Sequence, residues 1–259
     1  MKNKYLFVLC PIILLLFLAV FSYAQGDQTA LIDRKITVQF DKQPLGVIFQ
    51  RLMENFDLSI GFEQSVLDRE HHDYSFSPNL PAIAQVPKTS EYSMSLSVER
   101  LFEAGDHPIT VDVVNGTLSQ VLDQIVDQMK NYKWEISDDV VNIFPVKGRD
   151  PRFKELLETN ISQFRLPGKS RVKDITAQIQ LSREFNSWLR KNDLHFIGSR
   201  SGADALIDAQ YGRQVEPAMS FSKLTFRDLL NKISKVKKGG WILRWAGYHH
   251  GLEYVDLDI

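Results

Sequence analysis

Thiols are almost absent from this chain of 259 residues. Its one cysteine, Cys10, lies inside an apolar N-terminal run, so nothing after that run carries a thiol. This excludes disulfides, cysteine-ligated metal sites and a cysteine nucleophile from the remainder of the chain.

A long basic block and a phosphate-binding glycine loop are also missing. The chain has 31 Lys and Arg against 32 Asp and Glu, a net charge of −1. The densest cationic stretch, 235–238, falls at the end of a predicted helix, where cations complement the helix dipole. We therefore expect no nucleic-acid partner and no nucleotide cofactor.

The N-terminus has the layout of a secretory signal peptide. Two lysines precede an apolar run over 5–21, and Ser22-Tyr23-Ala24 forms a small-x-small cleavage site. We expect residues 1–24 to be removed after Ala24. Loss of the two lysines leaves 29 Lys and Arg against 32 Asp and Glu, a net charge of −3. An uncleaved membrane anchor is the alternative, because the run approaches the ~18 residues that a spanning helix needs.

Cleavage predicts a periplasmic or secreted protein with no stable membrane span. Export without disulfides is more typical of a bacterial envelope protein than of a small secreted animal domain. Sequons at Asn115 and Asn160 keep a eukaryotic origin open.

The rest of the chain repeats one pattern. Each copy begins with a strand in which apolar and polar residues alternate. Five residues after the last apolar residue of this strand comes the first residue of the apolar stripe of an amphipathic helix. The pattern occurs at 36–49, 109–122 and 219–230, and a weaker copy at 161–189 has Arg171 in place of the apolar anchor. Such units bury a core and need no catalytic residue.

The apolar stripes predict four helices. Pro44 begins the first, Thr117 and Gln120 form a capping box for the second, and Thr225 caps the last. Ser170 is the expected cap of a longer third helix, whose stripe slips near Gln180. The predicted helices cover 45–56, 118–129, 172–189 and 226–233.

Alternating apolar residues predict the strands between these helices. The strand at 58–62 is expected to be half-buried, with Ser59, Gly61 and Glu63 exposed. Trp134 and Trp241 hold equivalent places after their helices, which indicates core packing. Further strands are expected at 132–136, 140–144, 161–166, 241–245 and 252–259, and a loop at 198–217.

The elements read β-α-β-β-α-β-β over 36–146 and in nearly the same order over 158–259. We therefore expect an α+β fold of two tandem small domains, each with two helices packed on small sheets, after the cleaved signal peptide. Residues 68–107 form a long insertion in the first domain, of a length that is usually functional or disordered. Its segment 92–102 fits either a short helix or a strand.

This order, with Phe40-Asp-Lys-Gln-Pro44-Leu45 and Val113-Val-Asn-Gly-Thr117-Leu118 opening the first two helices, resembles the STN domain. That is the secretin and TonB N-terminal short domain of Gram-negative envelope proteins. Residues 36–145 match well apart from the insertion, and 161–259 match loosely. The resemblance implies a periplasmic interaction module without catalytic residues. No run of outer-membrane strands follows the modules, so secretion and siderophore uptake are not carried over.

Motifs that could carry chemistry each have a simpler interpretation. His71-His72-Asp73 could begin a metal site, but no third ligand is evident. The segment 198–202 has Arg200 where a nucleophile elbow has serine, which indicates a loop. Paired acids at 138–139 and at 256 and 258 fit solvated faces. We expect no catalytic residue, cofactor or metal.

Aromatic residues supply the candidates for partner contact. Trp245, Tyr248 and Tyr254 surround the last predicted hairpin, and exposed aromatics beside a strand edge suit docking by strand addition. The candidates are Trp245, Tyr248, His249, His250 and Tyr254 in that hairpin, and Tyr74, Phe76 and Tyr92 in the insertion.

The leading hypothesis is a non-enzymatic interaction module of an envelope assembly or signalling system, with protein partners and an open oligomeric state. One alternative is an exported hydrolase with a site between the domains, drawing on 71–73 and His195. Another is a module that binds a small molecule or glycan against Trp245 and Tyr248.

Overall fold

The architecture is α+β, as predicted. The computed structural model describes residues 31–68, 108–168, 170–196, 214–215, 218–249 and 252–259. The elements in chain order are β1 (Lys35–Gln43), α2 (Leu45–Phe56), β2 (Ser59–Glu63), a 3-10 turn (Val66–Asp68), β3 (Ile109–Thr117), α4 (Leu118–Met129), β4 (Tyr132–Ser137), β5 (Val140–Pro145), α5 (Pro151–Glu158), β6 (Asn160–Leu166), β7 (Ser170–Arg171), α6 (Val172–Leu181), α7 (Arg183–Lys191), β8 (Leu194–Phe196), β9 (Gln214–Val215), β10 (Met219–Thr225), α9 (Phe226–Lys237), β11 (Gly240–His249) and β12 (Leu252–Asp258).

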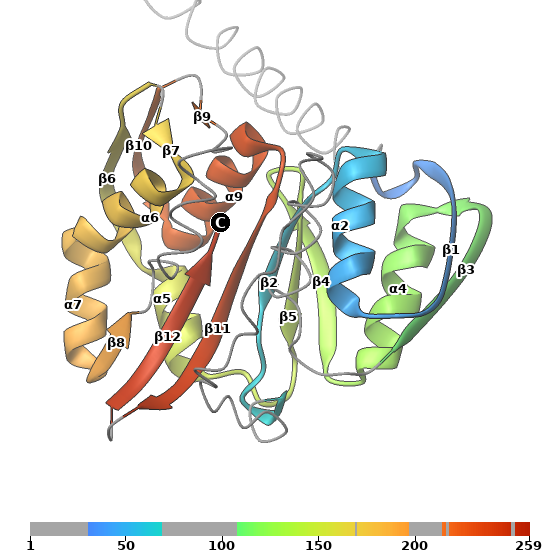
Figure 1. The fold of residues 1–259 in the computed structure, drawn as a ribbon, viewed down its shortest axis with the longest axis horizontal. Helices are drawn as coiled ribbons and strands as arrows, with labels where there is room; N and C mark the ends of the chain where they lie inside the picture. The colour runs from blue at the N-terminus through green and yellow to red at the C-terminus, as the bar shows by residue number, and fades with distance from the viewer. Residues whose placement is uncertain (1–30, 69–107, 169, 197–213, 216–217, 250–251) are drawn as a thin grey trace, which may run out of the picture.

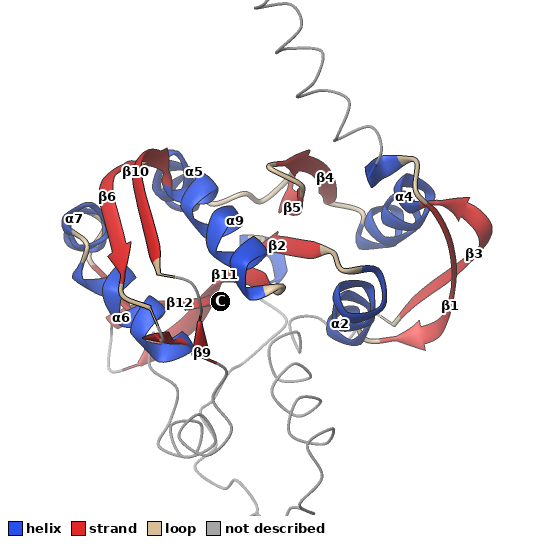
Figure 2. Cartoon of the chain, turned by 90° about the horizontal axis from the view of Figure 1, so that it is seen from above, coloured by secondary structure: helices blue, strands red, loops and turns tan. Residues whose placement is uncertain are grey.

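One six-stranded sheet runs through both halves of the chain, in the order β4-β5-β2-β11-β12-β8. Antiparallel ribbons, β1 with β3 and β6 with β10, lie away from it. Helices α2 and α4 lie between the sheet and the first ribbon, and α6 and α9 lie between the sheet and the second, with α7 beside α6 at the outer end (Figures 1 and 2). Strands β7 and β9, of two residues each, form a further antiparallel pair.

The sheet contains the same three-stranded motif twice. In β4-β5-β2 an antiparallel hairpin is followed by a strand parallel to its second member, and β11-β12-β8 has the same arrangement. The second motif is turned over, because Trp134, Phe62 and Ile242 face the first hydrophobic cluster while Trp241 and Leu243 face the second. The motifs are joined by parallel pairing of β2 with β11.

The recurring turn from strand to helix has a common conformation. The residue two positions after the last apolar strand residue has positive φ in all three clear copies: Lys42 (48°), Asn115 (50°) and Lys223 (55°). Few non-glycine residues adopt this left-handed region. The repeated spacing of five residues therefore accommodates one left-handed residue and one cap before each helix.

The capping predictions are confirmed in α4 and α9. The hydroxyl of Thr117 accepts from the Gln120 amide, and that of Thr225 accepts from the Asp228 amide; each third residue bonds back to the cap. The prediction for Ser170 is wrong, since it lies in β7 and its hydroxyl donates to the Pro167 carbonyl.

The long helix predicted over 172–189 is two helices. The break falls at Ser182, which caps α7 near the predicted slip of the stripe. Helix α5 begins in the interval between the two predicted domains, where the sequence analysis predicts no helix. Proline suits the first turn of a helix, and Asp150 caps it by accepting from the Arg152 amide.

The two tryptophans that follow α4 and α9 are equivalent, as predicted. The indole N–H of Trp134 donates to Asp123 Oδ1, and that of Trp241 donates to Asn231 Oδ1, both over 2.8 Å. Asp123 and Asn231 stand six residues after their respective caps, so each tryptophan binds the same place on its helix. Trp241 is buried and Trp134 is partly buried.

The two halves have separate hydrophobic clusters, except that Ile242 of β11 belongs to the first and Val66 packs on the second. The sheet, by contrast, is shared. Strand β2 lies in its interior, with α2 on one face and α9 on the other. All five β2 residues are therefore buried, and the prediction of a half-buried strand is wrong. No helix within the described ranges is long and apolar enough to cross a membrane.

The junction of β2 with β11 depends on a glycine. A Cβ at Gly61 would lie 2.3 Å from the indole Cε2 of Trp241. We expect Gly61→Ala to lower the free energy of unfolding by about 2 kcal/mol, because the buried indole must shift. Urea denaturation measures this. Gly239→Ala is the control, since a Cβ there meets nothing within 4 Å. Equal losses in the two variants would contradict the packing described.

Candidate functional site at the junction of the two halves

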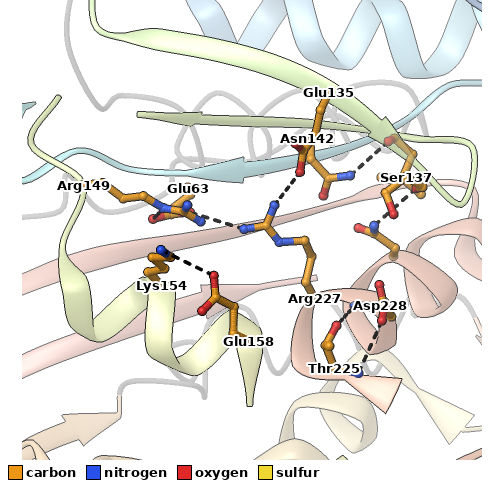
Figure 3. Close-up of polar contacts among 12 residues, drawn as sticks. Glu63, Glu135, Ser137, Asn142, Arg149, Lys154, Glu158, Thr225, Arg227 and Asp228 are labelled. Atoms are coloured by element: carbon orange, nitrogen blue, oxygen red, sulfur yellow. Dashed lines mark hydrogen bonds and ion pairs between the residues drawn. The ribbon is translucent and has the colours of Figure 1, made fainter. Parts of the chain in front are cut away.

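Charged side chains from both halves meet where β2, β5 and β4 face α5 and α9 (Figure 3). Glu63, at the end of β2, is 1% exposed. The Arg149 guanidinium holds both of its oxygens, with Nε 2.8 and 3.0 Å from Oε1 and Oε2 and Nη2 2.7 Å from Oε2. Such two-point contacts are among the stronger hydrogen bonds in proteins.

Arg227 extends this pair across the junction. It lies on the first turn of α9, and its Nη1 donates to Glu135 Oε1 over 2.8 Å. Its Nη2 is 4.0 Å from Glu63 Oε2. One arginine from the second half thus contacts carboxylates on two strands of the first half.

The Phe144 ring lies among three cations. Its centroid is 4.7 Å from Lys133 Nζ, 5.0 Å from Arg149 Cζ and 5.4 Å from Arg227 Cζ. Cations within ~6 Å of an aromatic face are attracted by its quadrupole. The ring therefore helps to hold Arg149 and Arg227 in place while they bind carboxylates.

Burial raises the pKa of Glu63 above its ordinary value of 4.5. The hydrogen bonds and charge of Arg149, and the charge of Arg227, lower it and only partly offset the burial. Glu63 thus loses its proton less readily than an exposed glutamate does, despite its two arginine neighbours.

A shallow hollow of about 300 Å³ opens over the cluster. Its walls come from β4, β5, α5, α9 and the segments before α5 and α9. Lys133 makes no ion pair with another described residue. The Thr225 hydroxyl is engaged as the α9 cap, and the walls hold no histidine or cysteine. The lining residues are Lys133, Glu135, Phe144, Arg149, Leu157, Glu158, Thr225 and Arg227.

Salt bridges also join the β4–β5 turn to α9. Lys232 approaches Asp138 at 3.7 Å and Lys235 approaches Asp139 at 2.6 Å. The side-chain amide of Asn231 donates to the Ser137 carbonyl. The acids are solvent-exposed, as the sequence predicts, and they also pair with the other half, which the sequence does not indicate.

A second hollow, of about 450 Å³, lies between α5 and α7. Burial opposes ionisation of Glu184 there, but hydrogen bonds from the hydroxyl and amide of Ser162 outweigh it and lower the pKa. Lys191 pairs with Glu155 beside it over 2.6 Å. The cluster fixes the start of α7 against β6.

The predicted exposure of Trp245 is wrong. Trp245 is 2% exposed, because α5 covers it: the Phe153 ring stacks on it at 4.4 Å and the Arg152 guanidinium lies 4.4 Å from its ring centroid. Hydrogen bonds to Asp150 and Glu253 hold Arg152 there and raise its pKa.

Of the other predicted contact residues, only Tyr254 has a described side chain. Tyr254 is half-buried, with its ring 5.4 Å from that of His195 on β8. Tyr248 and His249 belong to β11, and their side chains lie outside the description. Outside the described residues altogether are His250, Tyr74, Phe76, Tyr92 and the candidate metal residues 71–73.

Sequence reasoning did not identify Glu63, Arg149 or Arg227 as site residues. The alternation predicts Glu63 on an exposed strand face, and Arg149 lies between the two predicted domains, 36–146 and 158–259. A glutamate at the end of a strand otherwise rich in apolar residues was the only available signal. Within the described part of the chain, no group of three or more histidine or acidic residues could hold a metal ion.

Comparisons with protein-family models, curated proteins and solved structures found no match.

We expect Arg149→Met to lower the free energy of unfolding by about 3 kcal/mol at neutral pH, because Glu63 is left as a buried charge without its main partner. The loss should shrink as the pH falls toward 4.5. The folded state takes up the Glu63 proton first, so stability decreases as the pH rises from 4.5 through the raised pKa. Urea denaturation across this pH range measures both effects.

The double variant Arg149→Met/Glu63→Gln should recover most of the loss at neutral pH, because no buried charge remains. Lys235→Met is the matched control, since its pair with Asp139 is solvent-exposed and contributes about 1 kcal/mol or less. A loss in Arg149→Met that does not change with pH would contradict the assignment to Glu63.

Proposed function

We propose that this protein is a non-enzymatic, exported interaction module of a bacterial envelope assembly or signalling system, built from two STN-like units. The order of elements carries the proposal. The first half has the β-α-β-β-α-β-β order that the resemblance implies. The second half has nearly the same order, with two helices, α6 and α7, in place of the first helix and two short strands, β7 and β9, added. In each half, helices lie between a two-stranded ribbon and three strands of the sheet. A periplasmic location follows from the signal peptide expected over 1–24.

The charged junction supports this proposal over a hydrolase with a site between the halves. Glu63 and Glu135 are both bound by arginines there. His195, the one described histidine of the hydrolase hypothesis, lies on β8 at the opposite end of the sheet from β4. The ligand-binding alternative loses its Trp245 surface to the cover provided by α5.

The proposal is tested by site-specific photo-cross-linking of the full chain in a Gram-negative cell. A photoreactive phenylalanine derivative replaces Tyr254, and the control carries it at Glu158, whose side chain is 62% exposed. We expect a periplasmic protein that begins at Gln25 and cross-links from position 254 to a specific envelope protein. A chain lacking 68–107 shows whether the insertion contributes.

A cytoplasmic or uncleaved chain would contradict the location. The absence of any adduct beyond those of the Glu158 control, in chains with and without 68–107, would contradict the interaction role. Cell-wall hydrolysis that is lost in His195→Ala would favour the enzyme instead.

A further inference from the structure

The junction within the chain pairs the last strand of one three-stranded motif with the first strand of the other. The corresponding last and first strands at the two ends of the sheet have no such partner among the described strands. Strand β2 ends the first motif and β11 begins the second, and they pair in parallel. The counterpart of β2 in the second motif is β8, and the counterpart of β11 in the first is β4. Each is a terminal strand of the sheet, with no second neighbour among the described strands.

Strand β4 presents its backbone outward as β11 presents its backbone to β2. In β11 the Leu243 carbonyl accepts from the Gln64 amide, so the backbone of Leu243 faces β2. The backbone groups of Trp241, two residues earlier, point to the same side. Just before β4, the Asn131 carbonyl accepts from the Val146 amide, so the backbone of Asn131 faces β5. By the same alternation, the backbone N–H and C=O groups of Trp134 and Ile136 point away from β5, toward the open edge. The two equivalent tryptophans thus lie on corresponding edges, one paired within the chain and one at the end of the sheet.

Strand β8 begins as β2 begins. Each follows a helix and an aspartate of positive φ, Asp57 (54°) before β2 and Asp193 (52°) before β8. A buried leucine comes next, Leu58 or Leu194. Each strand then runs parallel to the second strand of its hairpin.

An added strand cannot take the place of β11 at β2. The notch at Gly61 is filled by Trp241, and α9 binds the β4–β5 turn through Lys235 and Asp139. The residue of α4 that corresponds to Lys235 is Asp127, so α4 carries an acid where α9 carries the cation of this salt bridge. The internal junction is therefore closed, and among the described strands of the six-stranded sheet, β4 and β8 are the ones with an edge to which a further strand can pair.

We propose that a second copy of this chain is a partner, and that β4 of one copy pairs in parallel with β8 of the next. This repeats between chains the parallel strand pairing that joins β2 to β11 within the chain. The Gly61 notch is not repeated, because Ile197 holds the place after Asp193 that Gly61 holds after Asp57. A contact between two different edges is heterologous and leaves one edge of each kind open, so it continues into a head-to-tail chain of copies. The inference rests on the proposed function and names one partner for it.

Cysteine cross-linking tests the pairing in the full chain, exported and purified, with Cys10→Ser in every variant. One variant carries Lys133→Cys on β4 and another Phe196→Cys on β8; both side chains face the side of the sheet that α9 covers, with Lys133 exposed and Phe196 half-buried. A bismaleimide of ~10 Å spans neighbouring strands, which lie ~4.8 Å apart. Circular dichroism confirms that each variant is folded.

We expect the mixture of the two variants to give about tenfold more cross-linked dimer than either alone, because a heterologous contact joins unlike positions. A chain with both substitutions should give a ladder of oligomers. Leu181→Cys, 75% exposed at the end of α6, replaces Phe196→Cys in the control mixture and should give only background.

Two results would overturn the inference. In one, the mixture gives no more dimer than the control and light scattering shows a monomer at every concentration, which would mean that the charges on β4 and the shortness of β8 protect these edges. In the other, either variant cross-links to itself as strongly as the mixture does, which would indicate a symmetric contact. A monomer that still forms the Tyr254 adduct with an envelope protein would leave the proposed function standing.

Discussion

Strand β2 is paired on both edges and covered on both faces, and the arrangement of the two halves follows from this. Its neighbours are β5 from its own half and β11 from the other. Helix α2 contacts one face and α9 the other. Such a strand has no position for an exposed side chain, which is why Gly61 must be small and why Glu63 must be met by an arginine.

The polar contacts at the junction extend what the backbone pairing begins. Gln64 continues the β2–β11 ladder, since its amide donates to the Leu243 carbonyl and its side-chain oxygen accepts from the Trp245 amide. Arg227 then joins α9 to β4 through Glu135. The charges there are placed where they connect elements remote in sequence.

Local features of the fold could be predicted from the sequence, because each is encoded within a few residues. The capping boxes that begin at Thr117 and Thr225, and the matching places of Trp134 and Trp241, are of this kind. The prediction of Trp245 as exposed is wrong, because Phe153 and Arg152 cover it. They lie about ninety positions earlier, on helix α5, which the sequence analysis does not predict. Glu63 was misplaced for the same reason: alternation describes one strand, whereas burial of both faces depends on helices from two halves.

The long separation between β2 and β11 also constrains the order of events when the chain folds. Gln64 and Trp245 are 181 positions apart, so a chain that emerges from its N-terminus has β2 available long before β11 exists. During this interval the Gly61 notch is empty and one edge of β2 is open to any other strand. Contacts between such distant segments form slowly, because a long loop must close first. The N-terminal half thus completes its part of the sheet only after β11 has been synthesised. Until then the open edge of β2 is a surface that a chaperone could protect.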